Sequence, residues 1–346
     1  KRTMPALVSV TIVTFNSRRY IGRCLQSVLE QGYPHLEIVV VDNASLDGTR
    51  LILGEFGDRI HVIANERNVG FAAGQNQAIA ASAGDWVLAL NPDVLLLPAF
   101  IERLVAAGRR DAEVGTVCGK LLRIGEDFEP LKERRLDSTG IYFTPNMRHF
   151  DRGWQEPDDE RFQQPEYVFG ASAAAALYRR EMIHDVSLED GFFDPDFFAY
   201  REDADVAWRA QLLGWRCLYT PAAEAYHVRR VVPGSRRNVP AFLNMHSVKN
   251  RFLMRVKNAT GDLYGRFWMP ATARDLLILG ACLFYEPGSL PAFLRLARCI
   301  PGALRKRRQI MRRRQVSDEY LAGWFRQEPA AQPAAEFALA NSGPPR

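Results

Sequence analysis

The sequence has few cysteines, and none lies in a pattern that binds zinc or builds a disulfide framework. The five are Cys24, Cys118, Cys217, Cys282 and Cys299, which are odd in number, widely spaced and never part of a Cys-x-x-Cys pair. Disulfide-stapled secreted domains and structural zinc sites need closely spaced pairs. The absence of such pairs argues against both classes and favours a reducing, cytoplasmic environment.

A long apolar run is also missing. The longest strongly apolar stretch, Leu276 to Tyr285, has about half of the roughly 20 residues that a bilayer-spanning helix requires. The first residues show no signal-peptide pattern. We therefore expect a protein that does not span a membrane.

A Gly-x-Gly-x-x-Gly motif is absent after the first predicted strand, which argues against a dinucleotide-binding fold. The 346 residues are 47% hydrophobic and 25% charged, which is enough to bury a full core.

The net charge of +5 is unevenly distributed along the chain. Residues 240–327 contain 16 Lys and Arg against 5 Asp and Glu, a net charge of +11. Residues 328–346 carry a net charge of −1, so residues 1–239 carry −5. We predict an acidic main domain over 1–239, a helical basic module over 240–327 and a disordered tail over 328–346 that is rich in Ala and Pro.

Apolar, β-branched runs that end in polar residues recur in the first part of the chain. The predicted strands cover residues 7–14, 37–41, 60–64 and 86–90, with helical stretches of about a dozen residues between them. This alternation predicts an α/β fold with a doubly wound, mostly parallel sheet. Such sheets bind ligands at the carboxyl ends of their strands, where the polar residues stand.

Beyond residue 114 the alternation is less regular. Three further strands are predicted, at Val114–Leu122, Tyr167–Tyr178 and Arg216–Tyr219. A helix is predicted from Asp203 to about Leu213, and Gly214 ends it. The polar residues 127–164 are expected to form loops and short strands that cover the ligand site.

Several sequence motifs lie at or near the ends of these predicted elements. In chain order they are VSVTIVTFN, VVVDNASLDGT, NVGFAAGQN, LALNPDV, VFGASAAAALYRR, FFAYREDADVAWRAQLLGW and Tyr226-His227. Together they resemble the inverting family 2 glycosyltransferases, which have the GT-A fold, and more narrowly the rhamnosyltransferase-like branch. The resemblance covers residues 7 to 230. It implies that residues 1–239 form a GT-A catalytic domain that transfers a sugar from a nucleotide diphosphate.

The resemblance implies that Thr14, Asn16 and Asp42 bind the nucleobase of the donor. Residues 14–16 and Asp42 lie at the ends of neighbouring predicted strands, so their polar groups converge on one crevice. A carboxylate there can accept a hydrogen bond from the imide of uracil or thymine. The alternative is that residues 42–45 only turn the chain and cap the next helix.

The resemblance places Arg67, Asn68, Gly70 and Gly74 around the nucleotide and the sugar. Glycines where a strand turns into a helix allow close approach of a ligand to the backbone, and helix N-termini favour anions. On spacing alone this motif is a weak indication.

Asn91-Pro92-Asp93 follows an apolar strand where the family usually has Asp-x-Asp. A diphosphate is neutralised by a divalent cation that takes one or two carboxylates from the protein. Asp93 is therefore the predicted metal ligand, and Asn91 is expected to contact the donor. Because the first carboxylate is lost, the choice between Mg²⁺ and Mn²⁺ stays open. The alternative is a turn that binds no metal.

His227 follows the last predicted strand, where the resemblance implies that it completes the metal shell or touches the diphosphate. A solvated loop histidine is the alternative. Four loop arginines, Arg229, Arg230, Arg236 and Arg237, are expected either to close over the phosphates or to be solvated.

Glu202, Asp203 and Asp205 open the predicted helix. By resemblance, Asp203 is the base that takes the proton of the acceptor hydroxyl, and Glu202 is the second candidate. A helix N-terminus favours an ionised carboxylate. The alternative is that all three acids only complement the helix dipole, with Asp205 and Arg209 as an i,i+4 pair.

The basic module is predicted to form amphipathic helices. In the first, apolar residues alternate at helical spacing with Lys249, Arg251, Arg255 and Lys257. Farther on, residues 305–314 contain seven cations in ten residues. We expect these charges to bind an anionic membrane surface. The alternative is a helical cap on the catalytic domain or on a second subunit in a homodimer, and no motif indicates nucleic acid as a partner.

The expected reaction is transfer of a sugar to a hydroxyl of a glycan or lipid-linked saccharide in surface-polysaccharide synthesis, at the cytoplasmic face of the cell membrane. By resemblance the donor is dTDP-L-rhamnose. The alternatives are a transferase that uses a UDP-hexose and a non-catalytic protein that binds nucleotide sugars.

Overall fold

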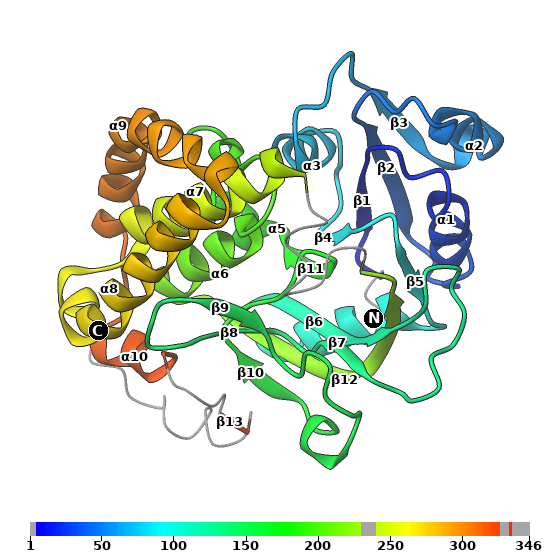
Figure 1. Ribbon diagram of the computed structural model, residues 1–346. Helices are drawn as coiled ribbons and strands as arrows, with labels where there is room; N and C mark the ends of the chain where they lie inside the picture. Colours follow the sequence, from blue (N-terminus) through cyan, green and yellow to red (C-terminus); the bar gives the residue numbers. More distant parts are fainter. Residues whose placement is uncertain (1–4, 230–239, 326–331, 334–346) are drawn as a thin grey trace.

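The computed structural model describes residues 5–229, 240–325 and 332–333. A single mixed sheet runs through the main part of the chain, with the strand order β13-β10-β12-β6-β11-β4-β1-β2-β3 (Figure 1). Helices cover the sheet, and a group of C-terminal helices packs at one flank (Figure 1). The predicted α/β architecture is confirmed.

The parallel part of the sheet contains the strands predicted in the first part of the chain. They are β1 (Val8–Thr14), β2 (Leu36–Asp42), β3 (His61–Ala64) and β4 (Trp86–Leu90). The helices that connect them are α1 (Ile21–Leu29), α2 (Thr49–Glu55) and α3 (Phe71–Ala80). Thr14 is in register with Asp42, so the polar residues after β1 and β2 meet at one edge.

The other part of the sheet is largely antiparallel. It contains β5 (Val94–Leu96), β6 (Val114–Arg123), β7 (Leu136–Ser138), β10 (Glu166–Val168), β11 (Ala175–Arg179), β12 (Arg216–His227) and β13 (Gln332–Pro333). β11 lies between β4 and β6 and runs antiparallel to both. The sheet is therefore mixed where the sequence predicted it to be mostly parallel.

The single strand predicted over residues 167–178 is two strands, β10 and β11, which occupy different places in the sheet. Between these two strands the chain passes close to the helix Glu202–Leu212 (α6), because a Cβ on Gly170 would lie only 2.2 Å from the Cβ of Ala207. Residues 172–174 consequently lie between the strands and are available to line a cavity.

β12 continues eight residues beyond the predicted end at Tyr219. It runs parallel to β6 with an irregularity between Tyr219 and Glu224, and it then pairs antiparallel with β5. This second pairing puts His227 opposite Val94 and therefore next to Asp93.

The polar residues 127–164 form loops and short strands, as predicted. Besides β7 they contain a separate hairpin of β8 (Ile141–Phe143) and β9 (His149–Asp151). The remaining helices of the main domain are α4 (Phe100–Gly108), α5 (Arg180–Val186), the 3-10 turn η3 (Pro195–Phe197) and α6 (Glu202–Leu212).

The C-terminal helices are α7 (Ala241–Asn258), α8 (Gly261–Phe284), α9 (Pro291–Arg312) and α10 (Asp318–Gly323), with the 3-10 turn η5 (Pro287–Ser289) between α8 and α9. They share the main core of the protein, because Leu253, Ala303 and Phe325 belong to the same buried cluster as Trp208 and Phe169. The boundary at residue 239 stays a prediction, but the helices after it are packed into the main domain.

The cations of α7 are buried, although the amphipathic pattern predicted that they face solvent. No more than 8% of the surface is exposed for any of Lys249, Arg251, Arg255 and Lys257. Lys257 Nζ lies 2.5 Å from Asp194 Oδ2 and 2.9 Å from Asp205 Oδ2. Buried carboxylates are costly unless they are paired, so the opposite charges of the two parts of the chain hold them together.

Most of the basic run at residues 305–314 is paired within the protein as well. The contacts are Arg305 with Glu189, Lys306 with Asp194, Arg307 with the carbonyl of Ala259, Arg313 with Asp185 and Arg314 with Asp318. Among the described residues this leaves Arg308 and Arg312 exposed without such a contact. The run offers fewer charges to a membrane than its sequence predicted.

The apolar stretch at residues 276–285 mostly belongs to a longer helix, the 24-residue α8. Within the described part of the chain, α8 alone has the length and apolar composition of a possible membrane span. Length and composition are a weak indication, because other helices of soluble proteins pass the same test. Only 17% of the most apolar window of α8 is buried.

Candidate active site

A cavity of about 550 Å³ lies where the carboxyl ends of β1 and β4 approach the C-terminal helices. Its walls come from the turn between β4 and β5, the hairpin of β8 and β9, residues 172–174, residues 198–203, the end of β12 and the first turns of α7. Segments that are far apart in sequence therefore meet around one space.

The cavity brings together most of the site residues predicted from sequence. Those that line it are Asn68, Gly70, Asn91, Asp93, Glu202, Asp203 and His227. Those that do not line it are Thr14, Asn16, Asp42, Arg67 and Gly74. Three residues of the second group, Thr14, Asn16 and Asp42, are sequence neighbours of Val13, Phe15 and Asn43, which do line the cavity.

Asp42 is fully buried, and its carboxylate is occupied by neighbours within the protein. It accepts hydrogen bonds from Thr14 Oγ1 at 3.0 Å, from the Ser45 amide at 3.1 Å and from Arg50 Nε at 2.6 Å. Burial by itself would raise the pKa of Asp42, but these hydrogen bonds outweigh it and lower the pKa. The contacts give Asp42 the turn-stabilising role that the sequence left as the alternative, and base recognition stays a prediction.

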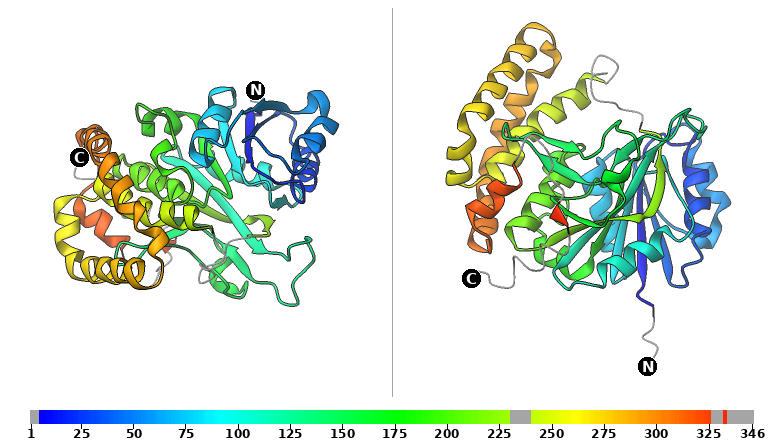
Figure 2. Two further views of the ribbon diagram at one scale, coloured as in Figure 1. Left: turned by 45° about the horizontal axis from the view of Figure 1, so that its top comes forward. Right: turned by 90° about the horizontal axis from the view of Figure 1, so that it is seen from below.

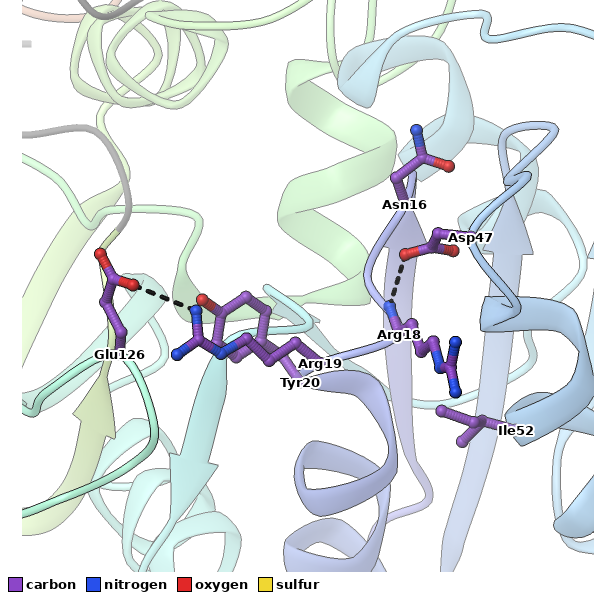
Figure 3. Close-up of a pocket in the computed structure, with 7 residues that line it drawn as sticks. All are labelled: Asn16, Arg18, Arg19, Tyr20, Asp47, Ile52 and Glu126. Atoms are coloured by element: carbon purple, nitrogen blue, oxygen red, sulfur yellow. Dashed lines mark hydrogen bonds and ion pairs between the residues drawn. The ribbon is translucent and has the colours of Figure 1, made fainter.

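Asn16 has a left-handed backbone with φ of 51° and lies in a second, open hollow of about 650 Å³. Its side chain accepts a hydrogen bond from the Leu46 amide at 2.9 Å. Figure 3 shows this hollow, in which the Arg18 amide donates to Asp47 and Arg19 pairs with Glu126. Neither the acids of α6 nor Asp93 lines it, so the chemistry belongs to the other cavity.

Two of the predicted donor residues have other environments. Arg67 is exposed to solvent beside Asn68. Gly74 lies inside α3, where a Cβ would come within 3.0 Å of the Val13 side chain, so it permits close packing of helix on strand. Gly70, in contrast, lines the cavity with φ of 87°, and a Cβ there would clash with Phe198 at 2.6 Å.

Asp93 and His227 form the predicted metal end of the cavity. His227 Nε2 lies 3.4 Å from Asp93 Oδ1, and His227 Nδ1 lies 2.8 Å from Asp137 Oδ2. Asp137 is completely buried and also pairs with Arg229 at 2.9 Å. Burial alone would lower the pKa of His227, but Asp137 and Asp93 outweigh it and raise the pKa to about 9.

This arrangement fits a divalent cation between Asp93 and His227. Histidines that bind metals usually donate their other ring N–H to a carboxylate, which fixes the tautomer, and Asp137 stands in that position. The described residues offer no cluster of three or more His, Cys, Asp or Glu for a metal. Further oxygen ligands would therefore have to come from a bound diphosphate.

Asp203 lies in the first turn of α6 and keeps part of its surface open to the cavity. Backbone amides orient its carboxylate, with Ala204 donating to Oδ1 at 2.7 Å and Ala173 to Oδ2 at 3.3 Å. Burial, with a further contribution from Asp151, raises the pKa of Asp203 to about 6. The carboxylate is consequently ionised at neutral pH and still basic enough to take a proton.

Glu202 differs from its neighbour in burial and hydrogen bonding. Only 7% of its surface is exposed, and its Oε2 is buried without a hydrogen-bond partner. Burial and the charge of Asp203 raise the pKa of Glu202 to about 8. At neutral pH the proton of this pair therefore resides on Glu202, which leaves Asp203 as the better base.

The loop before α6 has an unusual backbone that α7 holds in place. Phe198, Tyr200 and Arg201 all have positive φ, at 65°, 69° and 73°. Asn250 of α7 donates hydrogen bonds to the carbonyls of Phe197, Ala199 and Tyr200 at 2.8 to 2.9 Å. Left-handed backbone of this kind costs about 1–3 kcal/mol per residue and persists only where surrounding contacts fix it.

The cavity is also lined by two arginines, Arg148 and Arg201, that the sequence pattern did not indicate. Arg201 Nη1 lies 3.0 Å from His149 Nδ1. Burial, followed by the charges of Arg201 and Arg148, holds the pKa of His149 well below its usual range, so the ring is neutral. Arg229 pairs with Asp151 at 2.7 Å, whereas Arg230, Arg236 and Arg237 lie outside the described residues.

Two contributors to the site were missed for a common reason. Asp137 lies 90 residues before His227, and Asn250 lies about 50 residues after the carbonyls that it binds. No motif surrounds either residue, and both act through other residues of the protein. The i,i+4 pair of Asp205 and Arg209 was recognisable from spacing, and it is confirmed at 2.9 Å.

Comparisons with known proteins identify the family of this chain. A model of glycosyl transferase family 2 matches residues 9–187. An N-acetylglucosaminyl-diphospho-decaprenol L-rhamnosyltransferase of Mycobacterium tuberculosis is 27% identical over 240 residues, which cover 65% of this chain and 76% of the relative. A putative teichuronic acid biosynthesis glycosyltransferase of Bacillus subtilis is 42% identical over 90 residues, which cover 25% of this chain and 36% of the relative.

Solved structures share the fold at low sequence identity. GalNAc-T7 with UDP, GalNAc and Mn²⁺ is 17% identical with a TM-score of 0.57, covering 73% of this chain and 48% of that one. A mannosyltransferase from Pyrobaculum calidifontis with GDP-Man and Mn²⁺ is 19% identical with a TM-score of 0.52, covering 92% of this chain and 86% of that one. The predicted GT-A fold is thus confirmed, and because the family model matches more than half of the 346 residues, the chain belongs to glycosyl transferase family 2 and is a transferase enzyme.

Proposed function

We propose that this chain transfers L-rhamnose from dTDP-L-rhamnose, with inversion, to a hydroxyl of a lipid-linked saccharide in surface-polysaccharide synthesis. The observation that carries the proposal is that one cavity contains both an ionised Asp203 and the neighbouring Asp93 and His227. The relative from Mycobacterium tuberculosis, which aligns with 65% of this chain, has a name that favours this sugar and a lipid-linked acceptor.

The donor would bind with its diphosphate between the N-terminus of α3 and the pair of Asp93 and His227. The backbone at Gly70 approaches the cavity closely, and a helix N-terminus favours anions. A divalent cation held by Asp93 and His227, either Mg²⁺ or Mn²⁺, would neutralise charge on the leaving diphosphate. Asp137 orients His227 so that Nε2 faces this position.

The acceptor would enter beside Asp203. The carboxylate would take the proton of the attacking hydroxyl while the bond from the anomeric carbon to the diphosphate breaks. The amides of Ala173 and Ala204 fix its direction. Arg148 and Arg201 add positive charge to the cavity, which suits an acceptor that carries phosphate.

The family match makes the chain an enzyme, so of the two alternative functions only the one with another donor has specific support. A UDP-hexose as donor is favoured by the solved structures of fold relatives, since Staphylococcus aureus TarS 1-349 is described with UDP-GlcNAc, at 17% identity and a TM-score of 0.51 over 92% of each chain. A non-catalytic nucleotide-sugar-binding protein would use the same cavity without turnover. The choice among these functions depends on the donor and on turnover.

A donor panel tests the proposal directly. With Mn²⁺ or Mg²⁺ present, we expect nucleotide release from dTDP-L-rhamnose to exceed release from UDP-glucose, UDP-galactose and UDP-GlcNAc, and chelation of the metal to abolish it. Coupled detection of the released nucleotide diphosphate measures this. A UDP-hexose as the preferred donor contradicts the rhamnose assignment, and the absence of turnover with every donor and a short lipid-linked acceptor contradicts the enzyme itself.

Asp137→Asn tests the metal end of the cavity. We expect it to raise the Mn²⁺ concentration needed for half-maximal turnover by roughly 10–100-fold, because His227 loses the carboxylate that orients it. Metal titrations of turnover and of nucleotide binding measure the effect. The matched control is Asp127→Asn, whose side chain is 70% exposed and pairs with Arg19. An unchanged metal requirement in a folded Asp137→Asn protein would rule out His227 as a ligand.

A further inference from the structure

α8 leaves a long apolar face uncovered. The exposed fractions are 54% for Trp268, 64% for Met269 and Leu276, 65% for Leu277 and 80% for Phe284. In a helix, positions 269, 273, 276 or 277, 280 and 284 follow one another along one side, so Met269, Leu276, Leu277 and Phe284 form a single stripe. Trp268 lies outside this stripe, next to the kink at Phe267. Exposed patches of this size mark interaction surfaces.

The stripe carries no charge. The only charged residues of α8 after Phe267 are Arg274 and Asp275, and both are partly buried. Asp275 accepts a hydrogen bond from Arg255 of α7 at 2.6 Å, so it faces the protein. A helix face that is apolar along five turns and turns its charges inward is suited to an apolar medium.

The opposite face of α8 is packed against the protein, which favours lying on a membrane over crossing it. Leu263 belongs to the main core, and Ile278 and Cys282 pack with Met245 and Val248 of α7. If α8 crossed a bilayer, it would lose these contacts unless the helices packed against it entered the bilayer as well. One uncovered stripe on a folded body is the pattern of an interfacial helix.

The surroundings of the stripe match an anionic lipid surface. Trp268, Phe284 and Tyr285 are exposed aromatic residues, which favour the boundary between headgroups and acyl chains. Along α9, which shares a small core with α8, Arg298, Arg308 and Arg312 are exposed, whereas Arg305 pairs with Glu189. Two copies facing each other through the stripe would bring these arginines together, whereas anionic headgroups would neutralise them.

The stripe ends next to the cavity. A Cβ on Gly288 of η5 would touch Ala241 of α7 at 3.4 Å, and Leu243, Asn244 and Ser247 of α7 line the cavity. Figure 2 (right) shows α8 and α9 extending beyond the sheet on the side opposite the N-terminus. This is the side toward which β1 runs and on which the cavity lies.

We propose that the exposed face of α8, with the arginine edge of α9, docks the protein in the plane of an anionic lipid monolayer, so that the cavity lies beside the lipid surface. The docking surface is defined by Trp268, Met269, Leu276, Leu277, Phe284 and Tyr285. This inference rests on the proposed function, because docking serves catalysis only if the acceptor is linked to a lipid and the cavity has to lie beside the lipid surface. The apolar stripe replaces the basic run at residues 305–314 as the main membrane contact.

Sedimentation of the full chain with vesicles of phosphatidylcholine and phosphatidylglycerol tests the proposal. We expect the double variant Leu277→Asp and Phe284→Asp to bind at least about tenfold more weakly than wild type, since two large apolar side chains leave the lipid. The control Leu51→Asp changes a residue of α2 that is 78% exposed, and it should bind like wild type. Arg308→Glu with Arg312→Glu should weaken binding mainly to vesicles that contain phosphatidylglycerol.

Three results would overturn docking. These are wild type remaining in the supernatant with every vesicle, the double variant sedimenting like wild type, and a wild-type dimer that the double variant splits into monomers without any vesicle binding. Turnover on a short, water-soluble acceptor separates this proposal from the proposed function. Loss of docking leaves that turnover unchanged, whereas a chain that binds vesicles but turns over no donor contradicts only the proposed function.

Discussion

Replacing Asp203 with Asn is expected to lower kcat by roughly 10²–10⁴-fold, the usual contribution of a positioned general base. The amide keeps the shape of the side chain but takes no proton from the acceptor. The amides of Ala173 and Ala204 donate to the carboxylate, and one of these contacts can be kept by the Asn oxygen. Donor affinity should stay within a few-fold, because the donor's metal end is formed by Asp93 and His227.

Glu202→Gln is the matched control for this substitution. Because burial raises the pKa of Glu202 to about 8, its side chain is already protonated at neutral pH, and Gln imitates that form. We expect its kcat to stay within about tenfold of wild type. If Glu202→Gln loses turnover while Asp203→Asn keeps it, the roles of the two acids are reversed.

The pH profile provides a second readout for the same base. Asp203 acts in its ionised form and has a pKa of about 6, so kcat/KM should fall as the pH drops through about 6 and level off above it. Glu202→Gln should keep this acidic limb, and the residual activity of Asp203→Asn should lack it. A wild-type profile that is flat from pH 5 to 8 would argue against Asp203 as the base.

Lys257→Met is expected to reduce the free energy of unfolding by about 3–5 kcal/mol, the usual cost of breaking a buried ion pair. The side chains of Lys257, Asp194 and Asp205 are all completely buried. Met fills the same space, so the loss reports the missing cation between two buried carboxylates that, among the described residues, keep only Lys306 and Arg209 as charged partners. Urea unfolding followed by circular dichroism measures the change.

Arg305→Met serves as the control for that experiment. Its guanidinium also pairs with an acid, Glu189, but 61% of its side chain is exposed. Solvent screening limits such pairs to about 1 kcal/mol or less. Equal effects of the two substitutions would contradict the view that buried charge pairs hold the C-terminal helices on the catalytic domain.

The same network explains why the charge of the chain is so unevenly divided. The cations of α7 and α9 neutralise Asp194 and Asp205 of the main domain, which would be costly to bury alone. Through Asn250, α7 also fixes the left-handed loop that leads to Asp203. The C-terminal helices therefore support the active site directly, and their outer face remains available for a membrane.

Local features of the sequence were sufficient for the first part of the sheet and for the residues that follow its strands. Apolar runs form β1, β2 and β4, with β-branched residues dominant in β1 and β2, and Asp93 and Asp203 lie in the cavity as expected. Such runs have few alternatives, because they can be buried only as strands of a covered sheet. The polar residue after each strand is then carried to the same edge.

The partners of charged groups were decided by the tertiary structure alone. The sequence pattern made the cations of α7 and of residues 305–314 look exposed, and most of them are paired inside the protein. It gave no sign that Asp137 would orient His227 or that Asp42 would be occupied by Arg50. A charged side chain can be buried where an oppositely charged side chain pairs with it. Such partners often come from segments far apart in the chain, so the local spacing of residues in the sequence does not predict them.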